Sequence, residues 1–234
     1  MGFTASVSEI SLFMKTDATY IIILLFYVDD IILTGSNVSK IEIVIQELST
    51  VFDLKDLGQL TYFIGLQIQY KSNGDIFVNQ SKYIKDLVHK MMMTNGKLLE
   101  DPSTYKSIDG SLQYLTFTRH DIAFTVIPVR QYMNSPTDIH FSDVKRILRY
   151  LQGTLQHGIV YSSQSQAHLT TFSDSDWAAD LNTRRSVIGY AVYLGNSLIS
   201  WQSKKQTSVS RSSTEAEIRS LQAQLQTLLR LGKF

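Results

Sequence analysis

The stretch Tyr27-Val28-Asp29-Asp30 lies between two apolar runs, Ile21–Phe26 and Ile31–Leu33. β-branched and aromatic residues on both sides of a short polar break predict two strands joined by a tight turn, with both carboxylates at its tip. Neighbouring carboxylates repel each other, and a divalent cation relieves that repulsion. Magnesium suits Asp29 and Asp30, because it usually takes one or two protein carboxylates and completes its shell with water or phosphate. The alternative is an ordinary hairpin whose Asp-Asp turn is hydrated.

The composition indicates a globular, intracellular protein. The chain has 234 residues, of which 44% are hydrophobic, and no cysteine, which excludes a disulfide scaffold and a thiolate metal site. We expect no signal peptide, because no basic segment is followed by an apolar run and a cleavage site. The most apolar window, Tyr20–Leu33, contains two aspartates and is too short to span a membrane. The sequence indicates no particular compartment.

Positive charge is concentrated in the last part of the chain. Residues 140–234 carry 11 Lys and Arg against 6 Asp and Glu, whereas residues 1–90 carry 7 against 10. Within the predicted helix His140–Gln152, Lys145, Arg146 and Arg149 share one face. This face either contacts nucleic-acid phosphates or is simply hydrated.

Apolar periodicity predicts an alternation of helices and strands along the rest of the chain. Ser39 and Glu42 form a capping-box pattern at the start of the first helix. Gly65 interrupts an apolar strand, which marks either a close approach of another backbone or a ligand, or a bulge. The predicted helices are 39–52, 81–93, 103–116, 121–133, 140–152 and 212–231, and the predicted strands are 60–68, 76–79, 157–161, 169–173, 187–194 and 197–203.

A second pair of acids comes from the C-terminal part. Asp174 ends an apolar strand, and Glu217 lies four and eight residues before Leu221 and Leu225, on the helix stripe expected to face the sheet. We therefore expect Asp174 and Glu217 to converge. An inward carboxylate needs a partner, which is either a metal or an arginine in a structural ion pair. The candidate arginines are Arg184, Arg185 and Arg211.

Tyr27–Asp30 resembles the palm motif of reverse transcriptases in copia-type retrotransposon polyproteins. Further segments resemble the same family in the same order, over nearly the whole chain. They are Lys55–Gly58, Tyr62–Leu66 (a primer grip), Leu112–Leu115, Thr118–Ile122 and Lys145–Thr154 (the connection region), and Ser173–Ala178, Thr183–Ser186, Ile199–Trp201 and Ser210–Glu217 (the opening of ribonuclease H).

The resemblance implies roles for individual residues. Asp29 and Asp30 are expected to bind two Mg²⁺ ions for phosphoryl transfer, with Tyr27 and Val28 at the primer end and template. Gly65 is expected at the nucleic acid, within the primer-grip segment. Asp174 and Glu217 correspond to the first two acids of a metal cluster that cleaves RNA in an RNA:DNA hybrid. The implied partners are an RNA template, a DNA primer and the hybrid, with no membrane.

The resemblance also leads us to expect an incomplete copy. The family takes another palm aspartate from before the hairpin, and further ribonuclease H acids from beyond residue 234. His120 stands where the family usually has proline, and Asp109 stands where an apolar residue is expected. We therefore expect little or no polymerase or nuclease turnover.

The resulting interpretation is an α+β fold in three parts. Residues 1–97 are expected to form a partial palm and thumb, 98–156 a helical connection, and 157–234 the first three strands and helix of a ribonuclease H-like domain. That half-domain would leave the edge of strand Leu169–Ser173 uncovered and open to another chain. The alternative function is that of a domesticated or relic nucleic-acid-binding protein without catalysis.

Overall fold

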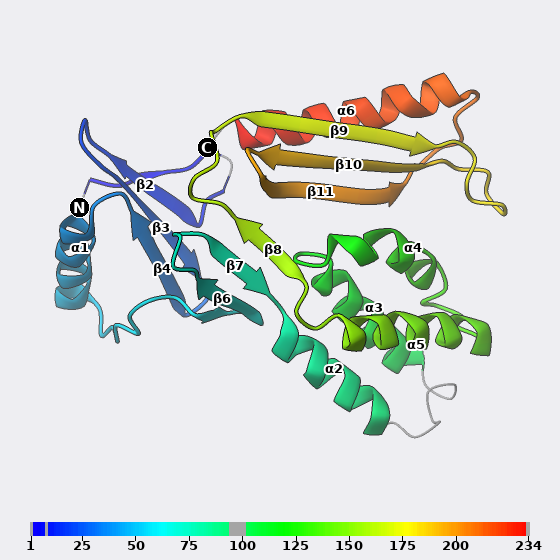
Figure 1. Cartoon of the computed structure of the whole chain (residues 1–234), viewed down its shortest axis with the longest axis horizontal. Coiled ribbons are helices and arrows are strands. Elements are labelled where there is room, and N and C mark those ends of the chain that lie inside the picture. Colours follow the sequence, from blue (N-terminus) through cyan, green and yellow to red (C-terminus); the bar gives the residue numbers. More distant parts are fainter. Residues whose placement is uncertain (1, 8, 94–101, 233–234) are drawn as a thin grey trace. The chain divides into compact units, whose positions relative to one another are not determined.

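The computed structural model describes residues 2–7, 9–93 and 102–232. Within these residues it has six α-helices and three antiparallel sheets, so the predicted mixed α+β class is correct at this level (Figure 1). The chain divides into two compact units, Met1–Leu60 with Leu225–Phe234, and Thr61–Gln224. The two units are defined by contacts within the structure, whereas the three predicted parts are defined by the resemblance to the family. The three-part division therefore stays a prediction. The predicted boundary between residues 97 and 98 lies outside the described residues.

The first unit is built on the predicted hairpin. Strands β3 (Ile21–Tyr27) and β4 (Asp30–Gly35) pair antiparallel, with Tyr27 opposite Asp30, which confirms the strand–turn–strand prediction. Two strands that the sequence analysis did not assign, β1 (Thr4–Ala5) and β2 (Leu12–Thr16), complete a sheet of order β1-β2-β3-β4. They were missed because Met1–Lys15 is mixed in character and lacks a clear period-two pattern.

Helix α1 (Val38–Val51) packs on this sheet. Val44 and Leu48 are buried against Ile22 and Leu24 of β3. The predicted cap is wrong, because the N-cap is Asn37, whose side-chain oxygen accepts a hydrogen bond from the Lys40 backbone N–H at 3.2 Å. Asparagine is as good an N-cap as serine, so the helix begins two residues earlier than the capping-box pattern indicates.

The second unit contains a four-stranded sheet of order β5-β6-β7-β8. The prediction of a single strand over residues 60–68, interrupted at Gly65, is wrong. The segment forms two antiparallel strands, in which Tyr62 pairs with Gln67 and Phe63 with Leu66. Ile64 and Gly65 form a two-residue hairpin loop, in which both residues have positive φ (48° and 80°). Its strands are β5 (Tyr62–Phe63), β6 (Leu66–Tyr70), β7 (Ile76–Asn79) and β8 (Gly158–Tyr161).

Four α-helices and a short 3-10 turn pack into one apolar core within this unit. The core includes Ile84, Leu112, Val126 and Leu151, all at most 4% exposed. The helix predicted from 121 begins instead with the 3-10 turn His120–Ile122. The helices lie close to their predicted ranges: α2 (Ser81–Met93), α3 (Pro102–Leu115), α4 (Ala123–Gln131) and α5 (Asp138–Gly153).

A separate three-stranded sheet and the last helix form the C-terminal layer (Figure 1). Its strands run in the order β11-β10-β9, and β9 is therefore an edge strand, as predicted for residues 169–173. Strand β8, predicted within the C-terminal part, instead pairs with β7 of the other sheet. The elements are β9 (Leu169–Asp176), β10 (Val187–Leu194), β11 (Ser197–Lys205) and α6 (Ser213–Leu231).

The prediction of which side of α6 faces the sheet is wrong. Leu221 and Leu225 are 48% and 56% exposed. The buried residues of α6 are Ala216, Ser220 and Gln224. Small and hydrogen-bonding side chains let the helix lie close to the strands, so the helix is turned away from the orientation that its leucines favoured. None of the helices in the described ranges is long and apolar enough to cross a membrane.

Candidate metal-binding acid pairs and basic face

The first acid pair lies at the end of a hairpin. Val28 and Asp29 form the two-residue loop between β3 and β4, and Asp30 begins β4. Val28 has φ of 52°, which is strained for a β-branched residue and costs about 1–2 kcal/mol. A positive φ at the first loop residue is the geometry that a type II′ turn requires. The sequence therefore holds the two carboxylates at the tip at some cost in local strain.

The tip of this hairpin is open to solvent. Asp29 and Asp30 are both exposed, and among the described residues neither forms an ion pair. Tyr27 is 47% and Val28 86% exposed. An exposed pair of carboxylates without a protein cation matches the hydrated alternative, and it equally leaves both carboxylates available to a divalent ion.

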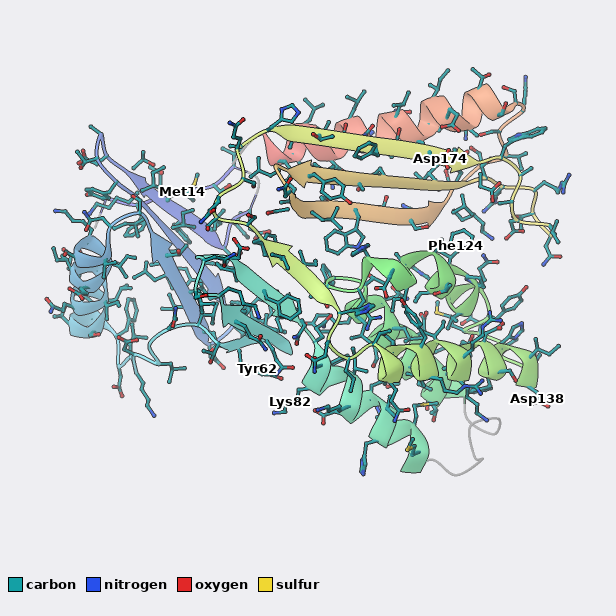
Figure 2. The ribbon with its side chains drawn as sticks, viewed as in Figure 1. Met14, Tyr62, Lys82, Phe124, Asp138 and Asp174 are labelled. Carbon is teal, nitrogen blue, oxygen red and sulfur yellow. The ribbon has the colours of Figure 1, made fainter. Side chains whose placement is uncertain are left out.

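The second acid pair comes from β9 and α6 in the other unit. The Glu217 carboxylate accepts a hydrogen bond from the backbone N–H of Ser175 at 3.3 Å, directly after Asp174, which Figure 2 labels on β9. The Ser220 hydroxyl donates to the Asp174 backbone oxygen at 2.8 Å and to that of Gly189 at 3.3 Å. These contacts fix α6 against β9 and bring the Glu217 carboxylate to the Asp174–Ser175 peptide.

The ion-pair alternative for this second site is not formed. Asp174 is exposed, Glu217 is half-buried, and within the described ranges neither carboxylate pairs with an arginine. Alternation along β9 places the Asp174 side chain on the face opposite to buried Ser175. Among the residues that the structure describes, no group of three or more His, Asp or Glu side chains is arranged to hold a metal.

The predicted nucleic-acid contacts lie on exposed surface in the second unit. Lys145, Arg146 and Arg149 are all exposed on α5, and Arg146 lies 3.4 Å from Asp143 in a surface ion pair. Gly65 lies in its hairpin loop, where an added Cβ would come within 3.4 Å of the Tyr83 ring. Positive φ, rather than a bulge, is thus the local requirement for glycine at this position.

Sequence reasoning missed a buried charge network beside the α5 C-terminus. The Arg119 side chain is 0% exposed and pairs with Asp121 through Nε (3.0 Å) and Nη2 (2.7 Å). It also donates to the Thr154 carbonyl at 3.1 Å and hydroxyl at 2.6 Å, at the C-cap of α5. Burial acts to raise the pKa of Asp121, but hydrogen bonds from Arg119 and Tyr150 outweigh it and hold the pKa below its usual value. The only feature of the sequence that could have indicated this network is the spacing of Arg119 and Asp121, two residues apart.

Comparison with known proteins identifies the family. Residues 1–104 match the family model described as reverse transcriptase (RNA-dependent DNA polymerase). The chain is 41% identical, over 94% of its length, to the retrovirus-related Pol polyprotein from transposon RE1 of Arabidopsis thaliana, but spans only 16% of that polyprotein.

Two shorter relatives are covered over most of their own length. An uncharacterised mitochondrial protein of Arabidopsis thaliana is 42% identical over 85% of this chain and 89% of its own. A putative transposon Ty5-1 protein of Saccharomyces cerevisiae is 31% identical over 93% of this chain and 77% of its own. No solved structure matches the chain. The chain thus belongs to the copia-type retrotransposon Pol polyproteins, and within them to the reverse transcriptase family.

Proposed function

We propose that residues 1–234 carry the magnesium-binding hairpin of an RNA-directed DNA polymerase and one acid pair of a ribonuclease H-type site. The observation that carries the proposal is the hairpin tip, where Asp29 and Asp30 are exposed and unpaired within the described residues. Oxygen ligands of this kind suit Mg²⁺. In a complete polymerase site, Mg²⁺ held by Asp29 and Asp30 would neutralise charge on the phosphates and activate the primer 3′ hydroxyl.

The residues around the first pair fit contact with a primer and its template. Tyr27 presents an aromatic ring beside the acids, and Val28 projects from the loop with most of its side chain in solvent. An aromatic and an apolar side chain can pack against sugars and bases, which are the parts of a primer terminus that carry no charge.

The second pair fits a role in cleaving RNA within an RNA:DNA hybrid. The Ser175 amide orients the Glu217 carboxylate, and a carboxylate held by a backbone N–H is partly preorganised for a metal. Asp174 would supply the other oxygen ligand from the exposed face of β9, which is opposite to the face that carries the buried Ser175 side chain.

We further propose that residues 1–234 do not turn over on their own. Two-metal catalysis needs ligands enough to fix both ions and the nucleophile, because positioning and electrostatics supply most of the acceleration. Within the described residues each site has a pair of acids rather than a larger group. This supports weak metal binding without productive geometry.

Activity assays test this part directly. The chain should neither extend a DNA primer on an RNA template nor cleave the RNA of a hybrid with Mg²⁺ and nucleotides present. The Asp29→Asn/Asp30→Asn variant should give the same background as the unmutated chain. Mg²⁺-dependent extension that this variant abolishes would contradict the proposed inactivity while supporting the assignment of the hairpin.

A second candidate function is nucleic-acid binding without catalysis, favoured by the exposed basic face of Lys145, Arg146 and Arg149. Replacing all three with alanine should weaken binding of an RNA:DNA hybrid at least about tenfold at low salt. It should also make the slope of log K against log salt concentration shallower, by the amount that the loss of about two to three phosphate contacts gives. Fluorescence anisotropy at several salt concentrations measures both. A control variant, Lys82→Ala/Lys85→Ala/Lys90→Ala, removes equal charge from α2. Hybrid binding that is insensitive to salt, or equally weakened in the control, would count against this function.

The outer edge of β9 is a surface where a strand of another chain could pair. It pairs with no described strand, although the Ser175 N–H is occupied by Glu217. We propose that strand addition at this edge is how residues 157–234 associate with other chains.

A further inference from the structure

A pocket between α3, α4 and β11 lies apart from both acid pairs. Its volume is about 490 Å³, within the range of small-molecule sites, and its walls all belong to the second unit. Helix α4 packs against α3 on one side and β11 on the other (Figure 1). The pocket is therefore part of a packed structure rather than a gap between separate units.

Three aromatic side chains line this pocket, and two of them are held by hydrogen bonds. The Trp201 indole N–H donates to the Thr116 carbonyl at 2.9 Å. The Tyr114 hydroxyl donates to the Ile64 carbonyl, and the Tyr114 ring packs edge-on against Tyr83 at 5.2 Å. The third, Phe117, is 67% exposed, although a phenylalanine would ordinarily be driven to bury its ring. The pocket thus presents preorganised aromatic surface for a planar ligand.

The polar groups of the pocket favour an anion with hydrogen-bonding edges. The Arg130 guanidinium forms no hydrogen bond or ion pair with the described residues. The Gln113 amide nitrogen is fixed by Asp109 at 2.6 Å, which leaves the oxygen of that amide as an acceptor. An acceptor of this kind suits an exocyclic amine, as on adenine or cytosine.

We propose that this pocket binds a single unpaired nucleotide, its base stacked on Phe117 and Trp201 and its phosphate at Arg130. Base stacking on aromatic side chains is tolerant of sequence, and a guanidinium is the preferred partner of a phosphate. The nucleotide comes either from solution or from a single strand. The site goes beyond the proposed function, because none of its residues belongs to the acid pairs or to the basic face of α5.

Tryptophan fluorescence provides the test, because the chain has two tryptophans. In a Trp177→Phe variant, Trp201 is the only tryptophan, so the tryptophan emission comes from the pocket. Adenosine monophosphate should quench its emission saturably, and Phe117→Ala should weaken binding about tenfold. The matched control is Phe124→Ala, which removes a 57% exposed ring of α4, labelled in Figure 2, from outside the pocket. It should leave the affinity unchanged.

A second pair of variants tests the phosphate. Arg130→Gln should weaken adenosine monophosphate about tenfold and adenosine little, whereas Arg184→Gln should change neither. If a short single-stranded oligoadenylate binds more tightly than the mononucleotide, the natural ligand of the site is a single strand. If the two bind equally, the natural ligand is the free nucleotide. Three results would overturn the proposal: no quenching by any of these probes, quenching lost equally in Phe124→Ala, or affinity for the nucleotide unaffected by Arg130→Gln.

Discussion

Replacing Arg119 with methionine is expected to lower the free energy of unfolding of the second unit by about 3–5 kcal/mol. The substitution keeps much of the side-chain volume but leaves the Asp121 carboxylate, 26% exposed, without its bidentate partner. It also removes the guanidinium from the α5 C-terminus, where it satisfies the Thr154 carbonyl and complements the helix dipole. Urea unfolding followed by tryptophan fluorescence reports on this unit, because Trp177 and Trp201 both belong to it.

The Arg119 prediction has a matched control and a coupled variant. Arg146→Met removes an arginine that is 75% exposed and should change stability by less than about 0.5 kcal/mol. Adding Asp121→Asn to Arg119→Met should recover part of the loss, since the unpaired charge is then gone. A loss below about 1 kcal/mol in Arg119→Met would show that the network contributes little.

Replacing Asp109 with leucine is expected to raise the free energy of unfolding of the same unit by about 1–3 kcal/mol at pH 7. Asp109 is 3% exposed within the helical core, and its Oδ1 has no hydrogen-bond partner among the residues that the structure describes. Burial raises the pKa of Asp109, and this outweighs the Gln113 hydrogen bond and the Arg130 charge, which lower it. The charged carboxylate is thus unfavourable in the folded chain.

The raised pKa also sets the sign of the pH dependence. Below the unfolded pKa, about 3.9, Asp109 is neutral in both states and does not penalise folding. As pH rises from there through the folded pKa, the unfolded state loses its proton first and stability falls. Asp109→Asn should therefore be more stable than the unmutated chain at pH 7, with the difference shrinking towards pH 4.

The control for Asp109 is Asp143→Asn, whose carboxylate is 40% exposed and should change stability by no more than about 0.5 kcal/mol. Equal or lower stability of both Asp109 variants at pH 7 would mean that the carboxyl finds a partner in solution.

Local sequence patterns predicted the elements with strong periodicity. Helix α2 was predicted over its observed range, because its apolar face repeats regularly from Tyr83 to Met91. The hairpins at Asn73–Gly74 and Gly195–Asn196 also follow from local sequence, because their loop residues accept the backbone geometry that tight turns need.

Elements decided by tertiary contacts were not predictable in the same way. The loop at Ile64–Gly65 was missed because isoleucine seldom has positive φ, and the Tyr114 hydroxyl bonds to its carbonyl from 50 residues away. The orientation of α6 depends on the hydrogen bonds of Ser220 to two strands, which hydrophobic periodicity does not record. The buried position of Arg119 likewise depends on a helix end 35 residues further on.

The candidate site shows the same division. The hairpin that carries Asp29 and Asp30 followed from local pattern, and its tip position is observed. The contact of Glu217 with β9 was expected for the wrong reason, because the leucine stripe that was to place it faces solvent. The metal and nucleic-acid roles of these residues stay predictions.

Manganese binding by the whole chain tests the central claim, that each acid pair holds a divalent ion. Mn²⁺ takes the same oxygen ligands as Mg²⁺, and electron paramagnetic resonance measures the free ion during a titration. We predict that Asp29→Asn/Asp30→Asn and Asp174→Asn/Glu217→Gln each remove one class of bound Mn²⁺, and that the fourfold variant removes both. The exposed control pair Asp53→Asn/Asp86→Asn should remove neither. Unchanged Mn²⁺ binding in the fourfold variant, or an equal loss in the control, would contradict the account.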